Sequence, residues 1–109
     1  MIVRTRVLAE APGRVWIAVG GTLGLATEPR LRQELRACDD GQRTEFFLDL
    51  TELRYKDELS DDTLRGLFAL DHDVRFHLIG APAEIRRRVA GDPRFTSHHG
   101  VESAWAVWT

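Results

Sequence analysis

The chain has 109 residues, of which 43% are hydrophobic and 29% are charged, and its formal net charge is −2. This length and composition fit one globular domain with a single modest core. The near balance of 15 basic and 17 acidic side chains gives no electrostatic drive toward nucleic acid or an anionic membrane. A single cysteine, Cys38, excludes an internal disulfide bond and any zinc site built from several cysteines.

The N-terminal segment contains Arg4 and Arg6 and has no long apolar stretch, so it does not resemble a signal peptide. No apolar run approaches the length that is needed to span a bilayer. We therefore expect a cytoplasmic protein that does not insert into a membrane.

Two strands are predicted at the start of the chain. Apolar and polar residues alternate over 3–8, as in a half-buried strand, and the run 15–19 is more apolar. The turn signal at 11–14 connects them closely, which indicates a hairpin. Residues 20–25 are glycine-rich and predict a loop.

A helix is predicted after this loop. Thr27 suits its N-cap, and Pro29 suits its first turn, where the missing N–H costs little. Leu31, Leu35 and Cys38 follow at i, i+4 and i+7, which places them on one apolar stripe. We expect Cys38 to be buried as a small hydrophobic residue.

The second half of the chain alternates strands and helices. Residues 46–50 predict a central strand, 64–68 contain a second helical stripe, and 74–78 alternate as a further strand. A third helix is expected between 80–82 and 91–93, which carry proline and glycine. This order implies parallel strand pairing with right-handed crossovers.

The C-terminal region is harder to interpret. Residues 95–97 suit a short last strand, and 101–107 suit a final helix, although their tryptophan also fits a strand. Adjacent His98 and His99 would point to opposite faces of a strand and make a poor metal site, so we expect surface polar residues. The arginines at 86–88 are most simply the solvated face of a helix.

Four phrases of the sequence resemble the STAS domain of bacterial anti-sigma factor antagonists. Residues 21–27 (GTLGLAT) look like that family's GELDLAT, and 47–51 (FLDLT) look like its VLDLS. Residues 78–82 (LIGAP) look like its LVGxP, and 101–106 (VESAWA) are similar to its SxEEALA. The resemblance implies one α/β domain over 1–109, a mixed sheet of four to five strands with helices mainly on one face.

The resemblance also implies a regulatory protein-binding module. Since no nucleophile, base and orienting group can be assembled from the sequence, we expect no catalytic activity, metal or cofactor. Members of this family bind an anti-sigma factor that is also a serine kinase, which releases the sigma factor. The kinase phosphorylates a serine in a DSSG turn at the start of the second helix, and phosphorylation breaks the complex. Other STAS domains are subunits of transporters, so an accessory subunit of a membrane transport complex is the alternative expectation.

The DSSG turn is absent from this sequence. One register sets residues 60–64 (SDDTL) against DSSGL, which places Asp61 and Asp62 at the two serine positions. Another register sets 57–59 (DEL) against DSS. Neither restores the phosphorylated turn, and Ser60 remains as a candidate phosphoacceptor in an acidic, glycine-free context.

Three interpretations of this acidic segment stay open. Ser60, Asp61 or Asp62 can cap the helix, where carboxylates complement its positive end. Alternatively, the two aspartates place about two negative charges where a phosphate would sit. The domain would then be locked in a state resembling the phosphorylated form, or would bind, independently of phosphorylation, a partner that prefers acidic groups there. Thirdly, Asp57 and Glu58 add oxygen ligands suited to Mg²⁺ or Ca²⁺, as in a small metal-dependent enzyme, although the spacing does not fit a calcium loop.

The predicted partner surface combines this acidic segment with the loop 22–27. The acids of the family's GELD are replaced there by Thr22 and Gly24. Its candidate contact residues are Asp57, Glu58, Ser60, Asp61, Asp62, Arg65, Thr22, Gly24 and Thr27. Trp105 and Trp108 are three residues apart and would share a helical face. The sequence is also compatible with a homodimer through the tryptophan tail or an exposed edge strand.

Overall fold

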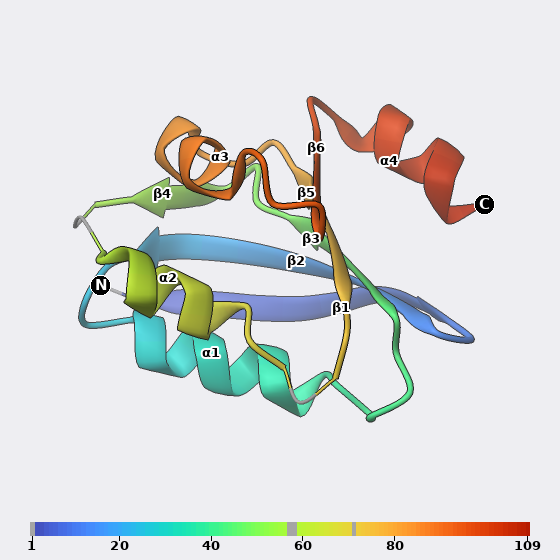
Figure 1. Cartoon of the computed structure of the whole chain (residues 1–109), viewed down its shortest axis with the longest axis horizontal. Coiled ribbons are helices and arrows are strands. Elements are labelled where there is room, and N and C mark those ends of the chain that lie inside the picture. The colour runs from blue at the N-terminus through green and yellow to red at the C-terminus, as the bar shows by residue number, and fades with distance from the viewer. Residues whose placement is uncertain (1, 57–58, 71) are drawn as a thin grey trace.

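The computed structural model describes residues 2–56, 59–70 and 72–109. Its elements, in chain order, are β1 (Val3–Ala11), β2 (Arg14–Leu23), α1 (Glu28–Ala37), β3 (Glu45–Asp49), β4 (Leu53–Tyr55), α2 (Asp61–Leu67), β5 (Arg75–Ile79), α3 (Ala83–Val89), β6 (Phe95–His98) and α4 (Val101–Trp108). Figure 1 shows how they are arranged, with α1 and α2 side by side and α4 apart from them.

The described strands form one mixed sheet in the order β1-β2-β3-β5-β6. β4 lies off this path and pairs with the C-terminal end of β2. β1 and β2 are antiparallel, while the other pairs are parallel. The predicted hairpin and parallel pairing are therefore confirmed. The sheet has six strands in the described residues rather than four to five, because the three residues of β4 are too few to show an alternating pattern.

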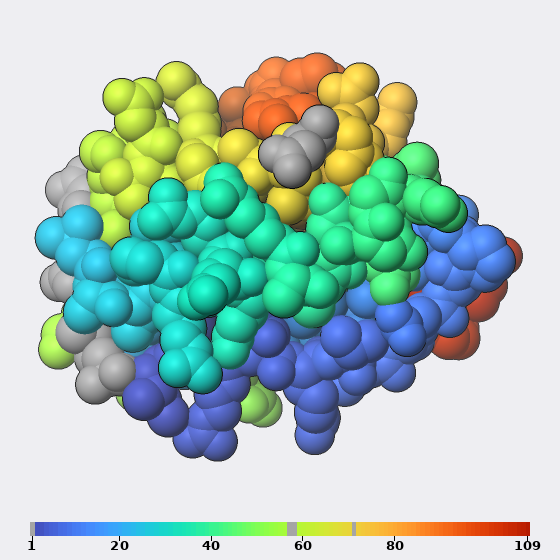
Figure 2. Space-filling view, turned by 90° about the horizontal axis from the view of Figure 1, so that it is seen from below, coloured from blue at the N-terminus to red at the C-terminus, as the bar shows by residue number. Residues whose placement is uncertain are grey.

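Alternate residues of the sheet face two different layers. Val15, Ile17 and Val19 of β2 are buried in the main core beneath α1, α2 and α3. Figure 2 shows that side chains of α1 and α2 cover this face. The expectation that helices lie mainly on one face is confirmed, since three of the four helices found in the described residues contribute to this core.

The opposite face of the sheet is covered by α4. Trp16, Phe47 and Ile79 point to this side and form a second, smaller core with Ala104 of the helix. Trp108 packs against the edge of this cluster. The structure thus settles the ambiguity at the C-terminus, because residues 101–108 form a helix rather than a strand.

β2 is longer than the sequence predicts and includes most of the expected loop at 20–25. Gly21 explains this difference, because its positive φ of 98° suits glycine. A Cβ there would lie 2.2 Å from the backbone oxygen of Ile2, so only glycine lets the two strands pair so closely. Cys38 is half-buried at the edge of the main core rather than fully buried.

Candidate functional site

The start of α2 is capped by a serine and carries two exposed carboxylates. The Ser60 hydroxyl oxygen accepts a hydrogen bond from the Thr63 backbone N–H at 3.1 Å. Of the three candidate caps, Ser60 is therefore the residue that caps the helix. The side chains of Asp61 and Asp62 are 70% and 96% exposed. Their charges lie in the first turn, where they complement the positive end of the helix.

Leu59, the residue before the cap of α2, is held in place by two side chains. The Tyr55 hydroxyl accepts a hydrogen bond from the Leu59 N–H at 2.7 Å. The Arg88 guanidinium of α3 donates to the Leu59 carbonyl and lies over the Tyr55 ring at 5.9 Å. Arg88 also lies 3.9 Å from an oxygen of Asp61. Leu59 is buried, and both its N–H and its carbonyl are hydrogen-bonded to side chains. These contacts fix the backbone just before α2.

The first residues of the predicted contact loop at 22–27 belong to β2 and lie beside β4. Thr22 and Leu23 pair with Arg54 and Tyr55 of β4, the strand that leads to α2. Whether these residues form one partner surface with the start of α2 stays a prediction.

Thr27 has a different role from the expected side-chain cap of α1. Its hydroxyl donates to the Thr22 carbonyl at 2.6 Å and accepts from the Gly24 N–H at 3.0 Å, and it makes no cap bond to the helix. Thr27 therefore holds the shape of the loop. Between these residues Leu25 is 63% exposed, a surface hydrophobic side chain that the motif comparison passed over.

The predicted contact residues differ in accessibility. Ser60, Asp61, Asp62 and Arg65 are exposed, Thr22 is half-buried, and Gly24 and Thr27 are buried. Asp57 and Glu58 lie outside the described residues. In the part of the chain that is described, no group of three or more His, Cys, Asp or Glu side chains could hold a metal ion. The hypothesis of a Mg²⁺ or Ca²⁺ site also needs Asp57 and Glu58, so it stays a hypothesis.

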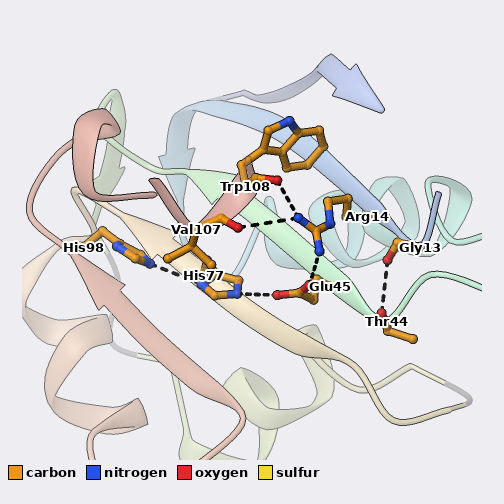
Figure 3. Close-up of polar contacts among 8 residues, drawn as sticks. All are labelled: Gly13, Arg14, Thr44, Glu45, His77, His98, Val107 and Trp108. Atoms are coloured by element: carbon orange, nitrogen blue, oxygen red, sulfur yellow. Dashed lines mark hydrogen bonds and ion pairs between the residues drawn. The ribbon is translucent and has the colours of Figure 1, made fainter. Parts of the chain in front are cut away.

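A second polar site lies between the sheet and α4 (Figure 3). His77 Nε2 lies 2.9 Å from a Glu45 oxygen, and His77 Nδ1 lies 3.1 Å from His98 Nε2. His98 Nδ1 in turn lies 2.8 Å from the Ser103 hydroxyl of α4. Both imidazoles are buried. The expectation that His98 is a surface residue is wrong, because β6 ends under α4, whereas His99 is exposed.

The direction of each hydrogen bond between these side chains follows from the Glu45 carboxylate. An ionised Glu45 only accepts, so His77 Nε2–H donates to it and His77 Nδ1 accepts from His98 Nε2–H. His98 Nδ1 is then free to accept from the Ser103 hydroxyl. Burial, with a smaller effect of the neighbouring His77, lowers the pKa of His98 below its ordinary value. The neutral form of His98 is therefore favoured in the folded protein.

Arg14 joins the same network to the end of α4. Its guanidinium lies 3.1 Å from Glu45 and donates to the Trp108 carbonyl, where a cation complements the negative end of a helix. Beneath α4, the Trp16 ring stacks on Phe47, with ring centroids 5.3 Å apart. The Phe47 ring in turn stacks on His77, with centroids 4.2 Å apart. Polar and aromatic contacts together hold the helix on the sheet.

In the described residues, no helix is both long enough and apolar enough to cross a membrane. No protein-family model matches the sequence, and no curated protein matches it either.

Solved structures resemble this fold over nearly its whole length. An anti-sigma factor antagonist from Mycobacterium paratuberculosis has a TM-score of 0.70 at 18% identity, over 96% of this chain and 92% of that chain. The phosphorylated form of the Bacillus cell fate determinant SpoIIAA has a TM-score of 0.59 at 17% identity, over 95% and 99% of the two chains.

An anion transporter also contains this fold. The murine anion transporter Slc26a9 matches with a TM-score of 0.66 at 16% identity, over 91% of this chain but only 18% of that chain. The likeness to all of these structures lies in the fold, since each is less than 20% identical to this chain. The chain therefore has the STAS fold, the fold of bacterial anti-sigma factor antagonists.

Proposed function

We propose that this protein is a regulatory protein-binding module, a divergent anti-sigma factor antagonist without catalytic activity of its own. Its partner would be a cytoplasmic anti-sigma factor with serine kinase activity. The observation that carries the proposal is the exposed start of α2, where Asp61 and Asp62 are presented to solvent. The clamp of Tyr55 and Arg88 around Leu59 presents this surface in one preformed shape, which reduces the entropy lost on binding.

We further propose that binding does not depend on phosphorylation. The two aspartates carry permanent negative charge at the start of α2, where a phosphoserine would carry about −1.5 to −2. Ser60 already uses its hydroxyl to cap the helix, so a phosphate there would replace an existing contact. Because a phosphate at this turn breaks the complex in the family, the partner of this protein would be one that prefers acidic groups at the start of α2.

Affinity capture of the tagged protein from its own cells tests this function. The baits would be the wild type, Asp61→Ala/Asp62→Ala, and Glu102→Ala, which removes an exposed carboxylate from α4 on the other face of the sheet. We expect an anti-sigma factor kinase to be captured by the wild type and Glu102→Ala, and to be lost from the double variant. Capture of permease or transport ATPase subunits instead would favour the alternative function, an accessory subunit of a membrane transport complex. The fold match to the anion transporter Slc26a9 is the reason to test for it.

Adding ATP to the purified complex tests phosphorylation independence separately. We expect the complex to persist. Dissociation that Ser60→Ala prevents would show that the partner is correct and that Ser60 is a working phosphorylation site.

A further inference from the structure

A pocket of about 360 Å³ opens between α2 and α3. This volume lies within the range of small-molecule binding sites. In Figure 2, α2 and the segment that contains α3 border one another along one edge of the face. The described residues that line the pocket are Asp61, Leu64, Arg65, Phe68, Arg87, Arg88, Val89, Asp92, Arg94 and Phe95.

Positive charge exceeds negative charge in this lining, which holds four arginines and two aspartates among the described residues. Asp92 is paired with Arg94 at 2.9 Å, and its pKa is lowered, chiefly by the Arg94 side chain. Asp61 lies 3.9 Å from Arg88. Both carboxylates thus already face a guanidinium of their own, and the excess charge belongs to the remaining two arginines.

Those two arginines are available to a ligand. Arg87 makes no hydrogen bond or ion pair in the described part of the chain. Arg65 lies 3.7 Å from Asp62, in a pair whose side chains are 73% and 96% exposed. Such a solvated pair contributes little free energy, so an anion in the pocket can compete for Arg65.

The walls of the pocket are firm. Leu64, Phe68 and Val89 are buried core residues, and Phe95 stacks on Phe76 at 5.2 Å. Arg94 lies over the Phe95 ring at 5.5 Å. The guanidinium groups therefore surround an apolar floor that excludes part of the water, which strengthens their attraction for an anion.

We propose that this pocket binds a phosphate-bearing anion through Arg65 and Arg87. A phosphate group has enough acceptor oxygens to form paired hydrogen bonds with two guanidinium groups, whereas the two oxygens of a carboxylate are used by one guanidinium group. The group can belong to a small phosphorylated metabolite or to a phosphorylated side chain of a partner. This site does not rest on the proposed function, since neither the sigma-factor partner nor the charge of Asp62 is needed for it.

Calorimetric titration at constant ionic strength tests the site, with inorganic pyrophosphate, O-phosphoserine and succinate as separate probes. The variants are Arg65→Ala, Arg87→Ala and the control Arg86→Ala, an exposed neighbour on α3 that does not line the pocket. Both pocket variants should bind the phosphorylated probes about tenfold more weakly, as expected for a lost charged hydrogen bond. Arg86→Ala should match the wild type.

Comparison of the three probes also shows whether the bound phosphate group comes from a small metabolite or from a phosphorylated side chain. Tighter binding of pyrophosphate supports a small metabolite, and tighter binding of O-phosphoserine supports a phosphorylated side chain. The proposal is overturned by equal binding of succinate, by an equal loss in Arg86→Ala, or by no saturable binding at about 10 mM probe.

Discussion

His77 and His98 are joined by a direct contact between their ring nitrogens, with His77 Nδ1 3.1 Å from His98 Nε2. The two residues come from neighbouring parallel strands, β5 and β6. The contact continues to Glu45 on one side and to Ser103 of α4 on the other. A buried polar chain thus connects the centre of the sheet to the C-terminal helix.

This contact predicts that the protein loses stability in mild acid. The pKa of His98 is lowered by burial and by His77 from its ordinary value of 6.5. The unfolded chain therefore binds more protons than the folded chain as the pH falls below that value. The stabilising effect is complete above about pH 6.5 and is lost as the pH falls through the folded pKa of His98.

Urea unfolding between about pH 7.5 and 5.5 measures this effect. His98→Gln keeps a polar side chain there but cannot titrate, so its free energy of unfolding should vary less with pH than that of the wild type. Glu45 faces His77 from β3, and Glu45→Gln controls for its contribution. Equal pH dependence in the wild type and His98→Gln would refute this role of His98.

The two tryptophans of α4 should differ in their effect on stability. The Trp108 ring packs edge-on against Trp16 and Phe47, with ring centroids 5.7 and 5.1 Å apart. Trp105 makes one tilted contact, with Trp16 at 5.9 Å, and is 51% exposed. We expect Trp108→Ala to lower the free energy of unfolding by about 2 kcal/mol and Trp105→Ala by no more than about 0.5 kcal/mol. If urea unfolding finds equal losses, α4 is not held by the contacts described.

Ser60 should stabilise α2 through its cap. Ser60→Ala removes the acceptor for the Thr63 N–H and should lower the free energy of unfolding by about 1 kcal/mol. Ser60→Asp restores a capping oxygen and should stay close to the wild type. Thermal unfolding followed by circular dichroism measures both variants. A loss in Ser60→Asp as large as in Ser60→Ala would argue against the cap.

Two glycines should respond to alanine in opposite directions. Gly21 has a φ of 98°, and a Cβ there would meet the Ile2 backbone, so Gly21→Ala should destabilise the hairpin by about 2 kcal/mol or more. A Cβ on Gly66, inside α2, meets nothing within 4 Å. Gly66→Ala should therefore stabilise the protein by up to about 1 kcal/mol. Chemical denaturation of both variants checks the signs, and the same sign in both would contradict this reading of the two sites.

The fold could be predicted from the sequence because its central elements carry strong periodic patterns. The apolar run at Phe46–Leu50 and the alternation at 74–78 indicate the strands that the structure contains as β3 and β5. β4 could not be found, because three residues show no period. The loop at 20–25 was predicted from its glycines, although Gly21 instead allows close pairing of two strands.

The candidate site was predictable only in part. Motif spacing predicted that Thr22 and the start of α2 belong to one surface, and the structure pairs Thr22 with Arg54 of β4, the strand before α2. The histidine chain was missed because its members are distant in sequence. Alternation along β5 puts His77 on the face opposite Phe76 and Leu78, which is a usable signal for a buried polar residue. Its partner Glu45 can be recognised only once β3 and β5 are known to pair.

The most direct test of the proposed function is to map the surface that the captured anti-sigma factor contacts. Chemical-shift changes in the backbone amides of the labelled protein, measured while the purified partner is added, provide this map. We predict that the largest changes occur at 59–66 and at the loop 22–27, with little change in α4 on the other face of the sheet. Changes concentrated on α4 around the exposed Trp105, with none at the start of α2, would contradict the account.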